Sequence, residues 1–134
     1  MSPPQQKGRV RPETDRDSAW WWEALSSGRF EVCRCAPHGH YFFPPAPGCS
    51  TCGSPDVRPA AVCGFGVVYS WIVVHKALDP AFVGDTPYTI VTVDLDEGAR
   101  VFGRIENGPL EAGQRVCATI YNVRGITLLG FERA

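Results

Sequence analysis

The sequence predicts a mainly β protein built from a short N-terminal helix, a cysteine-rich segment and a small five-stranded barrel. Two observations lead to this prediction. From Gly64 onward the chain alternates between β-rich runs and turn residues, with no convincing helix. Before that point, four of the six cysteines lie between Cys33 and Cys52. That stretch is too short and too rich in proline to bury a core of its own, so something must hold it together.

Length and charge limit the classes of function. The chain has 134 residues and a net charge of −1, which suits a small module followed by a small domain. A net charge so close to zero argues against non-specific electrostatic binding to nucleic acid or to anionic membranes. Residues 1–16 carry four basic and two acidic residues and are rich in proline and glutamine, so we expect a disordered tail there.

Neither a membrane span nor a secretory signal is evident in the sequence. No segment approaches the roughly 18 apolar residues of a transmembrane helix, and the N-terminus lacks the apolar stretch of a signal peptide. We therefore expect a cytoplasmic, reducing environment. Clustered cysteines in such an environment indicate a metal rather than disulfides.

The N-terminal helix is predicted over residues 17–29. Asp15 or Asp17 can cap it, and Gly28 ends it. Three consecutive tryptophans, residues 20–22, cannot all point into one small core. Either one or two of them pack onto the body while the rest lie at the rim, or they form a patch that binds a partner, since tryptophan is enriched in binding hot spots.

The cysteine-rich segment, residues 30–62, has the pattern of a zinc ribbon, in which two tight turns each supply two metal ligands. The second turn is plain, with Cys49 and Cys52 in a C-x-x-C spacing followed by glycine. The first has the same spacing and the same glycine, from Cys35 to Gly39, but histidine replaces its second cysteine. The predicted zinc ligands are therefore Cys35, His38, Cys49 and Cys52. Four protein ligands leave no open coordination position, so the zinc should be structural.

The sequence also allows other sets of metal ligands. Cys33 would give four thiolates in place of His38, although the first turn would then lose its shape. His40 is another alternative to His38, but it breaks the symmetry of the two glycines. A site without metal is a further alternative. Iron is possible in a rubredoxin-like site, whereas a histidine ligand favours zinc.

The barrel is predicted over residues 63–134. Its five strand-like runs occur in about 70 residues, a number that fits a small closed barrel. The runs are residues 67–77, 88–95, 100–105, 115–123 and 126–134. In the first run, alternate residues starting at Val67 should share one face and those starting at Val68 the other. Neither face is polar, so the ribbon and helix, or a partner, should cover the outer one.

The segments "WEALSSGRF", "YFFPP", "GFGVVYSWIVVHKA" and "PYTIVTVDLDEGARVFGRI" resemble the acyl-CoA-associated proteins that join a rubredoxin-like zinc ribbon to an OB-fold. The resemblance covers about residues 20–133 and implies that the five-stranded barrel is an OB-fold. Family members usually have two C-x-x-C-G turns with Pro-Pro between them. Measured back from Pro44 and Pro45, the second cysteine of the family falls on His38.

The resemblance also implies a function. Such proteins are non-catalytic accessory subunits of thiolase-superfamily enzymes, which include thiolases, lipid-transfer-protein-like aldolases and acyl-CoA condensing enzymes. They assist acyl-CoA binding or complex assembly, in steroid or fatty-acyl side-chain metabolism, and some are joined to a hydratase. We therefore expect no catalytic residue, a thiolase-like or aldolase-like partner with a hydratase as a further one, no membrane, and acyl-CoA as a shared ligand.

Contact residues are predicted on the helix and on the first barrel loop. Phe82 is an apolar residue on the loop that joins the first two strands, a usual rim of the OB-fold binding face. We expect Phe82, Trp21 and Trp22 to contact the partner, and His75 and Lys76 to offer charge to an acyl-CoA phosphate. The alternatives are a loop folded back on its own barrel and a histidine that merely ends a strand at the surface.

Two other classes of function stay open. A single-stranded nucleic-acid-binding module could use the aromatic residues Tyr69, Trp71, Tyr88 and Phe102, with Arg100 and Arg104 nearby. Residues 17–134, however, have a net charge of −3, whereas such binders need a positive groove. A free-standing enzyme acting on acyl-CoA would need a reactive group. Cys63 and Cys117 have no nearby histidine or acid in the sequence, so we expect both to be buried, inert thiols.

Overall fold

The computed structural model describes residues 12–123 and 125–134 and confirms the mainly β fold. Most of the predicted tail, residues 1–11, lies outside the described residues. The helix α1 (Ala19–Ser26) begins after Ser18, whose backbone N–H is bound by the carboxylate of Asp15 at 2.8 Å. No helix in the described part of the chain is long and apolar enough to cross a membrane.

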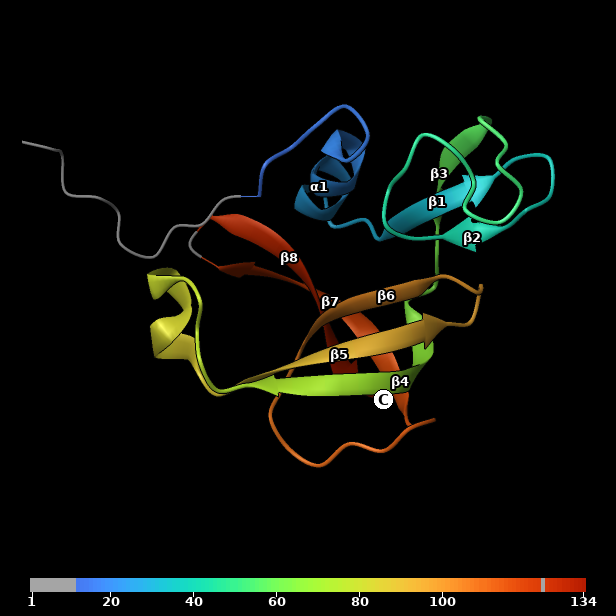
Figure 1. The fold of residues 1–134 in the computed structure, drawn as a ribbon. Coiled ribbons are helices and arrows are strands. Elements are labelled where there is room, and N and C mark those ends of the chain that lie inside the picture. Colours follow the sequence, from blue (N-terminus) through green and yellow to red (C-terminus); the bar gives the residue numbers. More distant parts are fainter. Residues whose placement is uncertain (1–11, 124) are drawn as a thin grey trace, which may run out of the picture.

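The cysteine-rich segment forms a three-stranded antiparallel sheet. Its strands are β1 (Glu31–Cys35), β2 (Tyr41–Phe42) and β3 (Val57–Ala61). The strand β1 lies in the middle, so the order is β2-β1-β3. This sheet stands beside α1 above the barrel (Figure 1), and it frames the loops that carry the predicted metal ligands.

The C-terminal half forms a closed five-stranded barrel, as predicted. Its strands are β4 (Phe65–Val74), β5 (Tyr88–Leu95), β6 (Arg100–Ile105), β7 (Arg115–Val123) and β8 (Ile126–Arg133). They close in the order β4-β5-β6-β8-β7. The burial of every second residue of β5 shows the alternation on which the prediction relied.

A short 3-10 helix in the first barrel loop was not predicted. This helix, η1 (Pro80–Asp85), follows Asp79, whose carboxylate accepts the N–H of Ala81 at 2.8 Å. Proline at the first helical turn suits such a start, because its missing N–H would have no partner there. The loop predicted between the first two strands therefore contains a short helical turn.

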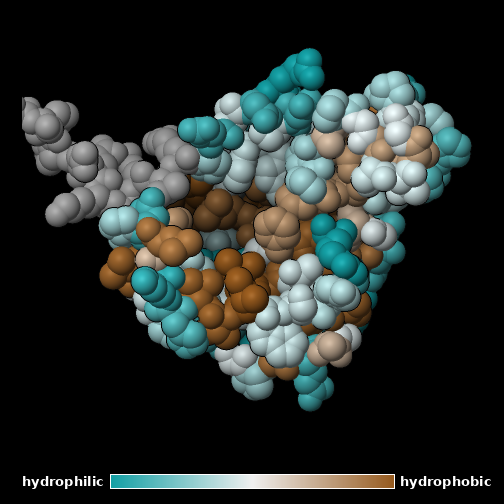
Figure 2. Space-filling model, in the orientation of Figure 1, coloured by the Kyte–Doolittle hydropathy of each residue, from teal (hydrophilic) through white to brown (hydrophobic). Residues whose placement is uncertain are grey.

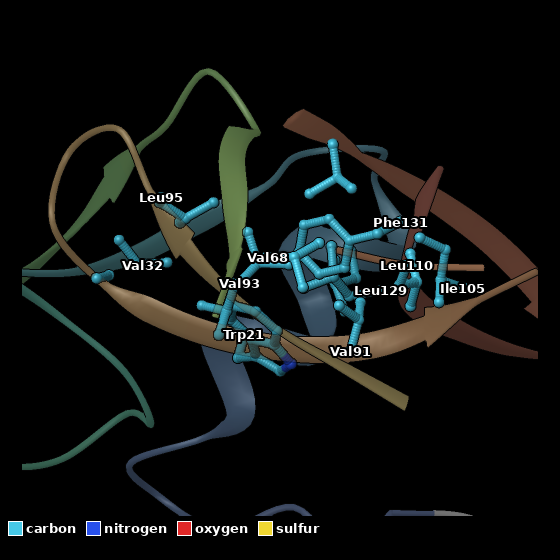
Figure 3. Close-up of a cluster of buried hydrophobic side chains, with 14 residues drawn as sticks. Trp21, Val32, Val68, Val91, Val93, Leu95, Ile105, Leu110, Leu129 and Phe131 are labelled. Carbon is cyan, nitrogen blue, oxygen red and sulfur yellow. The ribbon is translucent and has the colours of Figure 1, made fainter. Parts of the chain in front are cut away.

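A single core joins α1, the ribbon and the barrel. Trp21 and Leu25 of α1 and Val32 of β1 pack in one cluster with the barrel interior (Figure 3). The interior is lined by β-branched side chains such as Val91 and Val101, both completely buried. Because the three parts share this core, the ribbon is held in a fixed place relative to the barrel.

The strand β4 departs from the predicted alternation. A bulge shifts its register between Val68 and Ser70. Val68 lies opposite Val93, and after the bulge Trp71 lies opposite Val91. Trp71 therefore shares the side of Val68, and the prediction that it shares a face with Val67 was wrong, because a bulge adds one residue to a strand without a partner.

Candidate functional site

The two metal-binding turns have the same backbone hydrogen bonds. The N–H of Gly39 donates to the carbonyl of Cys35 at 2.6 Å, and the N–H of Gly53 donates to that of Cys49 at 2.9 Å. Both glycines have positive φ, +71° and +76°, a conformation that side chains disfavour. The twin turns predicted from the C-x-x-H-G and C-x-x-C-G spacings are thus present in the backbone.

Four side chains from these turns converge on one point. The ligand atoms of Cys35, His40, Cys49 and Cys52 all lie within 4.8 Å of one another. The Sγ atoms of Cys35 and Cys52 are 3.5 Å apart, and the Sγ of Cys49 is 3.7 Å from Nδ1 of His40. Zn–S and Zn–N bonds of about 2.3 and 2.0 Å in a tetrahedron separate ligand atoms by about 3.5–3.8 Å. The cluster therefore has the size of a zinc site.

The histidine in this cluster is His40, whereas the spacing predicted His38. His38 is exposed, and its Nδ1 is 4.0 Å from the Sγ of Cys35. Its ring stacks on the ring of His40, with 5.6 Å between the centroids. His40 is half-buried and faces the other three ligands. The structure thus brings together three of the four predicted ligands and adds the residue that the sequence analysis had held as an alternative.

Cys33, the other alternative ligand, is not part of this group. It is buried and packs with Phe42 beside the metal-binding cysteines. Burial raises the pKa of its thiol, because the charged form is poorly solvated there. A protonated, buried thiol behaves as a small apolar side chain, so Cys33 contributes to packing under the site.

The thiols of the second turn differ in their tendency to ionise. Desolvation opposes ionisation of Cys49, but the backbone N–H groups of Cys52 and Thr51 outweigh it and lower the pKa of Cys49 to about 6. The N–H of Ser54 favours the thiolate of Cys52, yet desolvation and the sulfurs of Cys35 and Cys49 raise its pKa on balance. Several thiolates so close together repel one another, and a divalent cation removes that cost. The donor set of three sulfurs and one imidazole fits zinc.

A second feature is an apolar hollow between α1, the ribbon and the barrel. It has a volume of about 340 Å³, within the range of ligand and side-chain pockets. Figure 2 shows this hydrophobic depression below α1, continuous with apolar side chains over the front strands. The apolar lining includes Trp22, Leu25, Phe43, Phe102 and Leu129. Phe102 is 55% exposed although it is large and apolar, and exposed apolar patches often mark interaction sites.

The predicted contact residues on α1 separate in the structure. Trp21 is buried and contacts Phe30 and Phe43, so it belongs to the core, and its remaining surface lines the hollow. Trp22 is half-buried and lines the hollow. Contact of Trp21 with a partner stays a prediction, limited to the small part of its side chain that lines the hollow, whereas Trp22 and Phe102 present more surface there. The alternation of residues 100–105 already turns Phe102 outward, but its position beside the hollow became apparent only from the structure.

The predicted contact residues of the first barrel loop lie away from the hollow. Phe82 is half-buried against Tyr88, with 6.4 Å between the ring centroids, so the loop folds back on its own barrel. His75 and Lys76 are exposed just after the end of β4. The structure places neither of them in the lining of the hollow.

Two arginines on the barrel surface, Arg100 and Arg104, are each paired with a carboxylate and an aromatic ring. The guanidinium of Arg100 lies 3.6 Å from the ring centre of Tyr69 and 2.7 Å from Asp94. Arg104 lies 3.9 Å from the ring centre of Tyr88 and 3.2 Å from Asp85. Ring faces covered in this way cannot stack on bases, and neutralised cations hold phosphates poorly. This arrangement disfavours the nucleic-acid alternative.

The two cysteines outside the ribbon face carboxylates. Cys63 is exposed, which corrects the expectation that it is buried, and its Sγ lies 3.6 Å from Glu97. Cys117 is half-buried and lies 3.7 Å from Glu132. Desolvation, and then the charge of Glu132, raise the pKa of Cys117. A catalytic thiol needs the opposite environment, one that favours the thiolate.

Two family models match the chain. The model described as the ChsH2 rubredoxin-like zinc ribbon domain matches residues 22–58, and the ChsH2 C-terminal OB-fold domain matches residues 60–120. These matches have the same order as the ribbon and barrel of the structure. A chain of the solved Ltp2-ChsH2(DUF35) aldolase superposes with a TM-score of 0.79 at 35% identity, over 92% of this chain and 98% of that one.

Three curated relatives are similar in sequence. A probable enoyl-CoA hydratase alpha subunit of Thermomonospora curvata is 42% identical over 69% of this chain. The 3-oxo-4,17-pregnadiene-20-carboxyl-CoA hydratase alpha subunit of Mycobacterium tuberculosis is 31% identical over 92% of it. This chain spans only 28% and 40% of the length of those two proteins. A DUF35 domain-containing scaffold protein of Pyrococcus furiosus is 28% identical, with 86% of this chain and 89% of that protein aligned.

Proposed function

We propose that this chain, which belongs to the ChsH2 family of proteins with a rubredoxin-like zinc ribbon and a C-terminal OB-fold domain, is a non-catalytic accessory subunit of a thiolase-superfamily enzyme. The enzyme would act on acyl-CoA, with a steroid or fatty-acyl side chain as the acyl group. The accessory subunit would assist complex assembly or acyl-CoA binding by its partner.

The observation that carries this proposal is the exposed apolar surface around Phe102 and the hollow beside it. A soluble chain seldom leaves so large an aromatic side chain over half exposed next to an apolar depression unless another molecule covers it. The size of the hollow suits one or two side chains of a protein partner. The similarity to a chain of the Ltp2-ChsH2(DUF35) aldolase supports an aldolase-like enzyme as that partner, and the hydratase names of two relatives support a hydratase as a further one.

The arrangement of reactive groups supports an accessory role. In the described residues, burial and the charge of Glu132 disfavour a reactive thiolate at Cys117, and the thiol of Cys63 lies 3.6 Å from the carboxylate of Glu97. The metal-ligand cluster already supplies four protein ligands, so a bound zinc would have no open position for a substrate. Neither arrangement supplies an activated nucleophile or a metal-bound water.

We propose zinc as the resident metal, held by Cys35, His40, Cys49 and Cys52. When bound, zinc supplies the cross-link that the short, proline-rich ribbon needs in order to stay folded. The ribbon in turn holds the Phe43 loop against α1 and the barrel. The role of zinc would thus be to shape the docking surface.

A more specific proposal is that this chain itself contacts acyl-CoA. It is supported by the resemblance of the sequence to acyl-CoA-associated proteins. The side chains expected to take part, His75 and Lys76, are exposed beside the first barrel loop, where solvent gives a phosphate free access. The hollow includes neither of them and is lined mainly by apolar side chains, with Glu13 and Ser18 as its polar members. We therefore propose that the partner holds most of the acyl-CoA, with Lys76 as a peripheral contact.

The direct test is reconstitution with a thiolase-like or aldolase-like subunit from the same organism. The purified chain alone should not turn over acyl-CoA thioesters. Co-expression should yield a stable complex and raise the activity or the soluble yield of the enzyme subunit. Robust turnover by the isolated chain that a single point substitution abolishes would overturn the accessory role, as would enzyme subunits that neither bind this chain nor respond to it.

A further inference from the structure

The strand β4 has an open edge along its C-terminal half. On one side it pairs with β5 along nearly its whole length. On its other side it pairs with β7 only from Phe65 to Val67, and Val68 then bonds to Gly113 and Gln114. Beyond Val68, no strand in the described part of the chain occupies this side. In an antiparallel strand every second residue points its N–H and C=O groups to such an edge.

This edge lacks the features that normally protect one. Proteins usually guard open edges with charged residues, proline or a distorting bulge. No charged residue or proline occurs between Phe65 and Val74, and the bulge lies at the start of the open stretch, between Val68 and Ser70. From Ser70 to Val74 the strand pairs regularly with β5, so its free edge is straight enough to accept another strand.

The side chains along this edge are apolar and exposed on both faces. Ile72 is 60% exposed, and Trp71 and Val73, on the opposite face, are 38% and 43% exposed. An extended backbone with unpaired donors and acceptors is recognised by another extended backbone, which satisfies them in a ladder of hydrogen bonds. Such an edge is therefore suited to binding another β-strand.

We propose that the strand is β4 of a second copy of this chain, paired antiparallel across a two-fold axis. Such an isologous contact is the commonest arrangement in homodimers. Because β4 carries no charge, two copies meet without opposing like charges. A register centred on Ile72 places Ile72 against its own equivalent and Trp71 against Val73 of the second copy, an aromatic and β-branched pair that favours sheet pairing.

This contact is compatible with the proposed docking surface and does not depend on it. Phe102 lies on β6, which is separated from β4 by β5. The open edge of β4 points away from α1 in Figure 1. A dimer formed through β4 would leave both hollows accessible and would present two of them to enzyme subunits.

The test is the mass of the full, zinc-loaded chain in solution, measured by light scattering and sedimentation over a range of concentrations. The wild-type chain should form a concentration-dependent dimer. Ile72→Lys should raise the dissociation constant about tenfold or more, because it places two lysines directly opposite each other across the two-fold axis. Leu78→Lys is the matched control, since Leu78 is 96% exposed on a loop beyond the strand, and it should leave the dimer intact.

A cross-link tests the register. In the wild-type background, Ile72→Cys should give a disulfide-linked dimer under mild oxidation, because directly opposed residues lie about 4.5–5.5 Å apart. Leu78→Cys and the wild-type chain give the background from other thiols. A monomer at every concentration, a dimer that Ile72→Lys leaves unchanged, or no cross-link above background would each overturn the proposal. A monomer whose binding to an enzyme subunit is weakened by Ile72→Lys would assign the edge to that partner instead.

Discussion

The ring of Phe43 meets the ring of Phe102 edge to face, with 5.5 Å between the centroids and 79° between the ring planes. Phe43 follows β2 in the ribbon and precedes the second metal-binding turn, whereas Phe102 lies on β6 of the barrel. Phe43 also contacts Trp21 of α1, at 4.8 Å between centroids. One loop thus connects the candidate metal centre, the helix and the proposed docking surface. Loss of the metal should therefore alter the position of Phe43 and with it the shape of the hollow.

Removal of zinc should therefore change the surroundings of the tryptophans. Without the metal cross-link the Phe43 loop should loosen, and Trp21 should become more accessible to water. We expect tryptophan emission to shift to longer wavelength as a chelator removes zinc, and to recover when zinc is restored. Cys117→Ser is the control, because Cys117 lies in the barrel, and it should respond as the wild type does. A zinc-free chain with unchanged emission would show that the loop is held without the metal.

Zinc retention should depend on pH. Zinc binds thiolates, so protons compete with it. The pKa of Cys49 in the metal-free fold is about 6, below its ordinary value of 9.0. The ionised thiol therefore stabilises the fold fully above about pH 9, and this contribution is lost as the pH falls through about 6. Zinc transfer to a colorimetric chelator should accordingly rise steeply below about pH 6, and transfer that is independent of pH would contradict the thiolate site.

The choice between the two histidines can be tested with a matched pair of variants. His40→Ala should bind well under one zinc per chain, because it removes a ligand that faces the three sulfurs. His38→Ala should keep one zinc per chain, because His38 is exposed and outside the cluster. Metal analysis of both purified variants is the measurement. Zinc loss in His38→Ala with retention in His40→Ala would restore the assignment that the C-x-x-H spacing predicted.

Two glycines should respond differently to alanine. A Cβ at Gly103 would lie 2.6 Å from the carbonyl oxygen of Leu129, whereas one at Gly84 would have no atom within 4 Å. Gly103→Ala should lower the free energy of unfolding by about 1–3 kcal/mol through overpacking between β6 and β8. Gly84→Ala should be neutral or slightly stabilising. Chemical denaturation measures both, and equal stabilities would mean that the two strands can separate at little cost.

The sequence predicted the order of elements well because the signals for them are local. Alternating apolar residues marked each barrel strand, and the glycines after each C-x-x-C or C-x-x-H marked the two turns. Local symmetry also suggested His38, because it occupies the position equivalent to Cys52. Which way an imidazole points, however, depends on the residues that surround it. His40 is the histidine that is half-buried and faces the three sulfurs.

Features that depend on pairing across the fold were not predictable. The bulge in β4 arises where Val68 bonds to the Gly113 loop while the strand continues along β5. Three consecutive tryptophans gave no signal for which one is buried, and the aromatic contacts of Trp21 with Phe30 and Phe43 decide it. Phe102 became a candidate contact only once β6 was placed beside the hollow.

The central claim, that the surface around Phe102 docks an enzyme subunit, is tested most directly by the affinity of the zinc-loaded chain for its thiolase-like partner. Phe102→Ala should weaken that affinity about thirtyfold, since loss of an aromatic anchor costs about 2 kcal/mol or more. Trp22→Ala should act in the same direction, and Leu78→Ala, at a fully exposed apolar position, should leave the affinity unchanged. Unchanged binding of the folded Phe102→Ala and Trp22→Ala variants would contradict the account and place the partner elsewhere on the molecule.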